Sequence, residues 1–160
     1  MKRLITILLS ISIGIVFILS ASSKIYPMEP FEFQFVDLGI ATWNTAPYIA
    51  RIFISMEFFI GMLLVLNIAL KKFSLKAAGF LLVSFSIYLI FRIITDGNNG
   101  NCGCFGEYVK MTPLQGLIKN IILMICCIGC YFSIDKELWQ VKWRNLVLPI
   151  LGIGSLCLGF

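Results

Sequence analysis

Residues 51–70 read RIFISMEFFIGMLLVLNIAL, and this stretch decides the fold class. After Arg51 its only charged residue is Glu57, and as a helix a run of about 20 residues spans the hydrocarbon core of a bilayer. The rest of the chain has the same character, because 59% of its 160 residues are hydrophobic and 13% are charged, compared with about a quarter charged in soluble domains. We therefore expect a membrane protein.

The apolar stretches define one transmembrane domain over residues 1–160, with spans expected at about 4–23, 49–70, 77–95, 113–134 and 145–160. The fold class is therefore all-α: a four-helix transmembrane bundle with a fifth, C-terminal transmembrane helix. The first stretch also resembles a cleaved signal peptide, but it is long for one, so a retained helix is expected. The last stretch is short for a span, which suggests either a short-ended chain or a fragment of a longer one.

Local signals mark several helix boundaries and contacts. The sequence TPLQ at residues 112–115 predicts an N-cap with a capping box. The spacing of Phe31, Phe35 and Leu38, with Pro30 ahead of them, predicts a short interfacial helix over the outer mouth of the bundle. The alternation of Phe31, Phe33 and Phe35 with polar residues also allows a strand, and a disordered loop is the third alternative. Gly61 would let a neighbouring helix approach closely.

The charges set the expected orientation. Lysines and arginines gather near the N-terminus, in the connection after the second span and in the one after the fourth, and such clusters mark the cytoplasmic side. The net charge of +5 is therefore attributed to the lysines and arginines that orient the protein in the membrane, and nucleic acid is not an expected partner. We expect a multi-pass protein of the bacterial inner membrane, with a cytoplasmic N-terminus and residues 100–106 on the extracytoplasmic side.

Those residues, GNCGCFG, carry the main chemical candidates, Cys102 and Cys104. Gly103 gives the backbone freedom that a disulfide between them would need, and the small ring would be strained, which suits a relay better than a durable link. A link to another cysteine, a free thiol pair and a metal site are the alternatives. With no histidine in the chain, histidine catalysis and most zinc chemistry are excluded, so no metal ligands are assigned.

Glu57 is the second candidate, because a carboxylate within a membrane helix needs a partner and is a functional candidate by default. The predicted spans bring Lys24, Glu57 and Arg92 toward the outer side. Arg92 is the expected partner, since guanidinium stays charged and can donate two hydrogen bonds. Lys24 is the second choice, because its side chain could instead reach the headgroups, and a structural pair without chemistry is the alternative. Three cysteines of the fourth span are expected to fill the core: Cys126, Cys127 and Cys130.

Taken in order, the segments SASSKIYP, MEFFIGMLLVL and NCGCFGEYVKMTPLQGLIKN resemble the MauE-type methylamine-utilisation proteins within the wider DoxX-like membrane group. The similarity covers about residues 10–134, and the last segment is its most specific part. It implies a redox-associated four-helix bundle that supports maturation of disulfide-rich extracytoplasmic proteins. By the family pattern the motif positions are Lys24, Glu57, Arg92, Cys102, Cys104, Phe105 and Gly106. Some relatives carry an outer thioredoxin-like domain beyond such a C-terminal helix, so the resemblance implies either a missing C-terminal extracytoplasmic domain or a separate partner protein. The resemblance does not tie this chain to methylamine itself.

Together these features predict a membrane thiol–disulfide redox protein, which as an enzyme would be a thiol-disulfide oxidoreductase. In this protein Cys102 and Cys104 would react, and Gly103, Phe105 and Gly106 would support them. Its partners would be extracytoplasmic protein thiols or a thioredoxin-like domain, with lipid around the bundle. No cofactor is demonstrable from the residues, although a quinone would be a suitable electron partner. The alternatives are a non-catalytic assembly factor that docks a periplasmic partner, and a small-solute carrier gated by Glu57.

Overall fold

A computed structural model describes residues 2–98 and 111–134, and the regular structure within these ranges is helical. The expected all-α fold is confirmed. The elements are α1 (Lys2–Ile25), α2 (Glu29–Asp37), α3 (Ala46–Val65), a short π-helix η1 (Leu70–Ser74), α4 (Leu75–Asp96) and α5 (Pro113–Ser133). The expected fifth span, 145–160, lies outside the described residues.

Four segments are long and apolar enough to cross a membrane: Leu4–Ile25, Ala46–Val65, Leu70–Thr95 and Pro113–Ser133, with hydropathies from 1.8 to 2.6. They correspond to the first four spans expected from the sequence, and the protein is a multi-pass membrane protein. The clearest shift is in the second span, which starts at Ala46 and ends at Val65 rather than covering 49–70. This shift moves Glu57 deeper into its helix.

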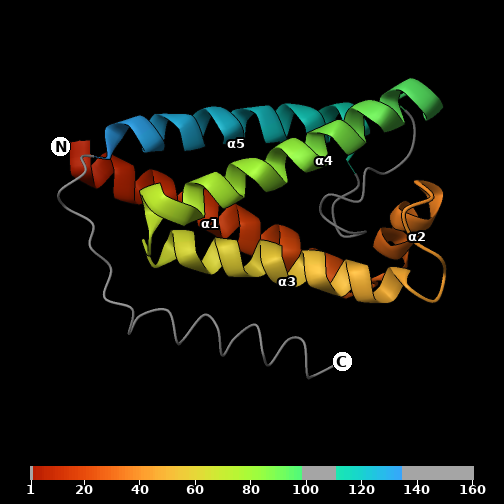
Figure 1. The fold of residues 1–160 in the computed structure, drawn as a ribbon. Helices are drawn as coiled ribbons and strands as arrows, with labels where there is room; N and C mark the ends of the chain where they lie inside the picture. The colour runs from red at the N-terminus through yellow and green to blue at the C-terminus, as the bar shows by residue number, and fades with distance from the viewer. Residues whose placement is uncertain (1, 99–110, 135–160) are drawn as a thin grey trace.

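The four long helices run side by side in a bundle, α1 antiparallel to α3 and α4 antiparallel to α5 (Figure 1). At one end, which we call the η1 end, the π-helix connects α3 to α4. From there α4 diverges from α3, and α2 lies at the opened end of the bundle (Figure 1), which we call the α2 end. The bundle is therefore closed at the η1 end and filled by a short helix at the other.

The closest helix crossing is between α1 and α3. A Cβ atom added to Gly14 would lie 2.7 Å from the carbonyl oxygen of Gly61, and one added to Gly61 would lie 3.0 Å from the carbonyl oxygen of Gly14. Nearby, Ser10 Oγ donates a hydrogen bond to the carbonyl oxygen of Leu64 at 2.9 Å. The close approach expected at Gly61 is confirmed, and it fixes the relative height of the two helices.

The segment expected to form a short helix does so, as α2, with Pro30 in its first turn. Phe31 and Phe35 point into the bundle, where Phe35 packs against Phe53 and Phe31 against Phe85. The strand and the disordered loop are wrong as alternatives, since the inward spacing of the two phenylalanines is helical. That α2 lies in the membrane interface stays a prediction.

The ends of α4 and α5 are also held as their sequences indicate. Thr112 and Gln115 form the expected capping box. The backbone N–H of Gln115 donates to the Thr112 hydroxyl oxygen, and the backbone N–H of Thr112 donates to Gln115 Oε1. The amide of Leu114 donates to Asn98 Oδ1 at 3.0 Å, which ties the start of α5 to the residues just after α4. At the η1 end, Lys71 Nζ donates to the carbonyl oxygen of Ile134 at 2.7 Å.

Candidate functional site

Glu57 lies well inside the second span and is buried. It is eleven residues after Ala46, so its Cα lies about 16 Å along the helix at 1.5 Å per residue. Only 5% of the residue is exposed. A carboxylate at such a position requires a partner, because burying an uncompensated charge is strongly unfavourable.

The partner is Lys24, in the last turn of α1. Its Nζ lies 2.8 Å from Glu57 Oε2, and the two side chains are 3% and 6% exposed. Lys24 Nζ also donates to Ser20 Oγ, one turn earlier on α1, at 2.9 Å. The lysine therefore lies back over its own helix, and the alternative in which it reaches the headgroups is wrong.

The helix directions explain why these two residues meet. Side chains in a helix lean toward the N-terminus of that helix. Because α1 runs toward the α2 end and α3 runs away from it, Lys24 leans into the bundle while Glu57 leans toward Lys24. A long side chain on the last turn of α1 thus reaches a carboxylate that lies deeper in α3.

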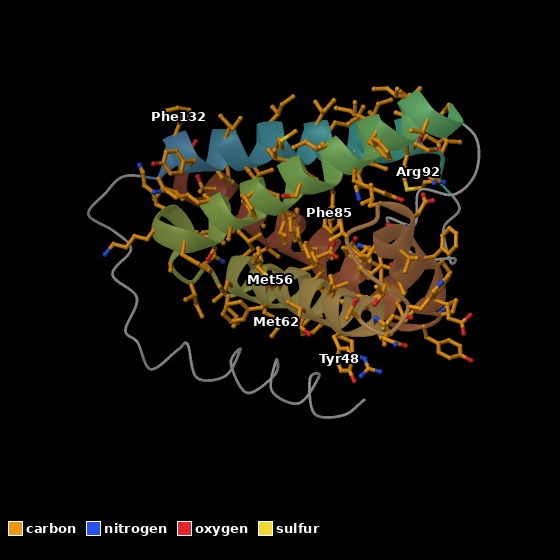
Figure 2. All side chains as sticks on the ribbon, turned by 45° about the vertical axis from the view of Figure 1, so that its right-hand side comes forward. Tyr48, Met56, Met62, Phe85, Arg92 and Phe132 are labelled. Carbon is orange, nitrogen blue, oxygen red and sulfur yellow. The ribbon has the colours of Figure 1, made fainter. Side chains whose placement is uncertain are left out.

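Two aromatic rings enclose the ammonium group. Lys24 Nζ lies 5.5 Å from the centroid of Phe31 on α2 and 5.2 Å from that of Phe85 on α4. Figure 2 shows Phe85 in the middle of the bundle, between α4 and α3. Cation–π contacts of this length favour a desolvated cation, so the rings offset part of the cost of burying it.

A small cavity with both polar and apolar side chains in its wall lies beside the ion pair, and α1, α2, α3, α4 and α5 all contribute to it. It offers about 20 Å³ to water-sized molecules, which is enough for one water molecule. Besides Lys24 and Glu57, its polar lining comprises Ser20, Gln34, Tyr88, Lys119 and Asn120.

Comparison with known proteins places this bundle in a family. The family model of the methylamine utilisation protein MauE matches residues 2–133. The chain belongs to the MauE family. It is 36% identical over 150 residues to protein TlpB of Flavobacterium psychrophilum, an alignment that covers 89% of this chain and 40% of that protein. The chain thus spans about two fifths of the length of this relative. No solved structure matches the chain.

The MauE match covers Arg92 as well, but this residue does not pair with Glu57, so the pairing expected from the sequence is wrong. Arg92 Nη1 instead lies 2.8 Å from Asp37 Oδ2, at the end of α2. The divergence of α4 from α3 is the physical reason: in Figure 2, Arg92 at the end of α4 lies far from Met56, the neighbour of Glu57 on α3. The arginine is closer to α2 than to the buried carboxylate.

The motif of the MauE-family chain that holds Cys102, Gly103, Cys104, Phe105 and Gly106 lies outside the described residues. What the structure gives is the position of the flanking chain. Asn98 follows α4 and Met111 precedes α5, and the hydrogen bond from Leu114 to Asn98 joins the two sides. The described residues on both sides of the motif therefore lie at the α2 end, the end where Lys24 lies.

The cysteines of α5 behave as the sequence indicates. Cys127 and Cys130 are 5% and 1% exposed and belong to the hydrophobic core of the bundle, and Cys126 packs against that core. The expected core role is confirmed. These thiols are on the η1 side of the ion pair and do not line its cavity.

Sequence reasoning missed several residues around Lys24. Phe31 was singled out for helix periodicity, but its contact with a cation was not foreseen, and Ser20, Phe85 and Asn120 were not singled out as site residues. One signal was available for Ser20, because it precedes Lys24 by four residues and such residues share a helix face. The aromatic contacts depend on how α2 and α4 approach α1, and no spacing in the sequence encodes that approach.

Proposed function

We propose that this MauE-family protein is a membrane thiol–disulfide redox protein in which Cys102 and Cys104 exchange disulfides with extracytoplasmic proteins. In this proposal the buried Lys24–Glu57 pair at the α2 end supports the reaction. Gly103, Phe105 and Gly106 would shape the loop. The function is oxidative maturation of partner proteins, in keeping with the family.

The observation that carries the proposal is the burial of a complete ion pair at the α2 end. A buried salt bridge is weak evidence for stability, since replacing both charges by apolar groups is often neutral or stabilising. Its presence in a membrane span therefore points to a function.

The chemistry proceeds through a mixed disulfide. A thiolate of the partner attacks the Cys102–Cys104 disulfide, forming a bond to one cysteine and releasing the other as a thiolate. The second thiolate of the partner then attacks the mixed disulfide. The partner gains a disulfide and loses two electrons, and Cys102 and Cys104 are left as a dithiol after taking up two protons.

The dithiol must then be re-oxidised. We propose a lipid-soluble quinone as the acceptor: the dithiol passes two electrons and two protons to it, the disulfide re-forms and the quinone becomes a quinol. A small part of the support is location, because the residues that flank the motif, Asn98 and Met111, follow and precede membrane-spanning helices. The cavity beside Lys24 holds about one water, so the quinone is not assigned to it.

Thiol trapping in cells tests the proposal. Alkylation gel shifts should show both the dithiol and the disulfide form of the pair, in a ratio that changes with the supply of oxidant. Cys102→Ser or Cys104→Ser should accumulate a mixed disulfide with a partner, while the matched variant Cys126→Ser, in the core, should cycle normally. A pair that remains a dithiol under every condition would leave a non-catalytic assembly factor as the function.

One observation favours a second candidate, a small-solute carrier. The cavity beside Glu57 is lined by residues of all five described α-helices, and intramembrane carboxylates often mark solute paths. A carrier would depend on Glu57 and tolerate Cys102→Ser together with Cys104→Ser, whereas the redox protein would lose its activity in that double variant.

A further inference from the structure

A groove lies between α4 and α5 on the η1 side of the bundle, away from the ion pair. Its volume is about 260 Å³, roughly nine times the 30 Å³ that a water molecule occupies in the liquid. The apolar wall is formed mainly by Leu75, Gly79 and Val83 of α4 and by Met124, Ile128 and Phe132 of α5. The groove is therefore large enough for several methylene groups of a hydrocarbon chain.

The groove opens toward the bilayer. Val83, Ile128 and Phe132 are 46%, 56% and 79% exposed, and Figure 2 shows Phe132 pointing away from the bundle. A Cβ added to Gly79 would meet no atom within 4 Å, so the glycine leaves a space in the helix surface. Lipid chains, and not water, surround this part of a membrane span.

The positively charged side chain of Lys76 lies at one end of this apolar groove. Lys76 lines it, is exposed, and lies in the first turn of α4. This turn is near the start of the membrane span Leu70–Thr95, and from such a position a lysine side chain can extend to the lipid headgroups. Among the described residues that line the groove, Lys76 is the charged one and none is acidic.

We propose that this groove binds one anionic phospholipid, with an acyl chain along Gly79 and the phosphate at Lys76. Basic pockets between membrane helices bind anionic lipid headgroups in this way. The apolar wall alone would accept any acyl chain, and the lysine would select a headgroup with a net negative charge. This site is independent of the thiol chemistry proposed for the other end of the bundle.

The full chain, reconstituted in nanodiscs with equal amounts of phosphatidylglycerol and phosphatidylcholine, provides the test. Native mass spectrometry after release should find one retained phosphatidylglycerol, preferred over phosphatidylcholine about fivefold, as one lysine near the headgroups predicts. Lys76→Gln should bring that preference close to one. Gly79→Leu should fill the groove and reduce the retention of both lipids.

Matched controls make the result specific. Lys72→Gln removes an exposed lysine at the same end that does not line the groove, and Gly129→Leu fills an open glycine position on α5 outside it. Both should retain phosphatidylglycerol as the parent does. Equal retention of the two lipids by the parent, or equal losses in the control and groove variants, would overturn the proposal.

Discussion

Two ion pairs in the described part of the chain have the same length but different surroundings. Lys24–Glu57 and Arg92–Asp37 both have a nitrogen–oxygen distance of 2.8 Å. The side chains of the first pair are 3% and 6% exposed, and those of the second are 26% and 39% exposed. Distance alone would rank the two pairs as equal, so their energetic difference must come from the environment.

The buried pair is the one whose disruption matters. Removing one partner of a buried pair leaves a charge without compensation, which costs about 3–5 kcal/mol. An exposed pair contributes about 0–1 kcal/mol, because water screens it and the side chains lose entropy. The comparison therefore predicts a steep order of effects among variants, which unfolding experiments in detergent can establish.

The largest effect is expected from Lys24→Met. Methionine fills similar space but leaves the Glu57 carboxylate buried without its cation, so we expect a loss of about 3–5 kcal/mol, measured as the free energy of unfolding. Lys72→Met, at an exposed position, serves as control and should change stability by less than about 0.5 kcal/mol. Equal stability of Lys24→Met and the parent would show that Glu57 does not need this cation.

The second experiment separates stability from function. Lys24→Met combined with Glu57→Met removes both charges, and we expect the double variant to regain most of the stability lost in Lys24→Met, since an apolar pair can replace a buried ion pair. Thiol–disulfide cycling should nevertheless be impaired. Normal cycling in a stable double variant would mean that the pair is structural only.

The third variant, Gly14→Ala, acts on the helix crossing that sets the pair. The added methyl group would lie 2.7 Å from the Gly61 carbonyl oxygen, and because this neighbour is backbone, α1 and α3 must shift apart, at about 1–3 kcal/mol. Gly129→Ala, where the space is open, should be neutral or slightly stabilising. If both variants unfold alike in thermal scans, the crossing is not tight.

Much of this fold follows from the sequence. Apolar runs of sufficient length predicted five spans, of which the four within the described residues are confirmed. A Thr–Pro–Leu–Gln signal predicted the start of α5, and both kinds of signal depend on local properties. The inward position of Glu57 was also predictable, since a carboxylate cannot face lipid hydrocarbon at low energetic cost. These features need no knowledge of how the helices are arranged.

The partner of Glu57 was not predictable in the same way. Taking Arg51 as the start of the span placed Glu57 about two turns below the surface, near the level of Arg92. The helix begins at Ala46, which places Glu57 about three turns deep, and α4 diverges from α3 at that end (Figure 1). Pairing depends on tertiary geometry: the lean of Lys24 along α1 and the insertion of α2, which brings Asp37 to Arg92.

The smallest effect is expected from Asp37→Asn, which removes the exposed pair. We change Asp37 because Arg92 has other interactions. Asp37 is the last residue of α2, where a negative charge is unfavourable with the helix dipole, so its removal should partly offset the lost ion pair. We expect a change of about 0–1 kcal/mol in unfolding free energy, which should shrink further at about 1 M salt, where the Debye length is only about 3 Å. The loss in Lys24→Met should persist at high salt, because salt screens buried pairs much less. A loss in Asp37→Asn as large as that in Lys24→Met, at either salt concentration, would contradict the distinction between the two pairs and would make the attachment of α2 to α4 a major source of stability.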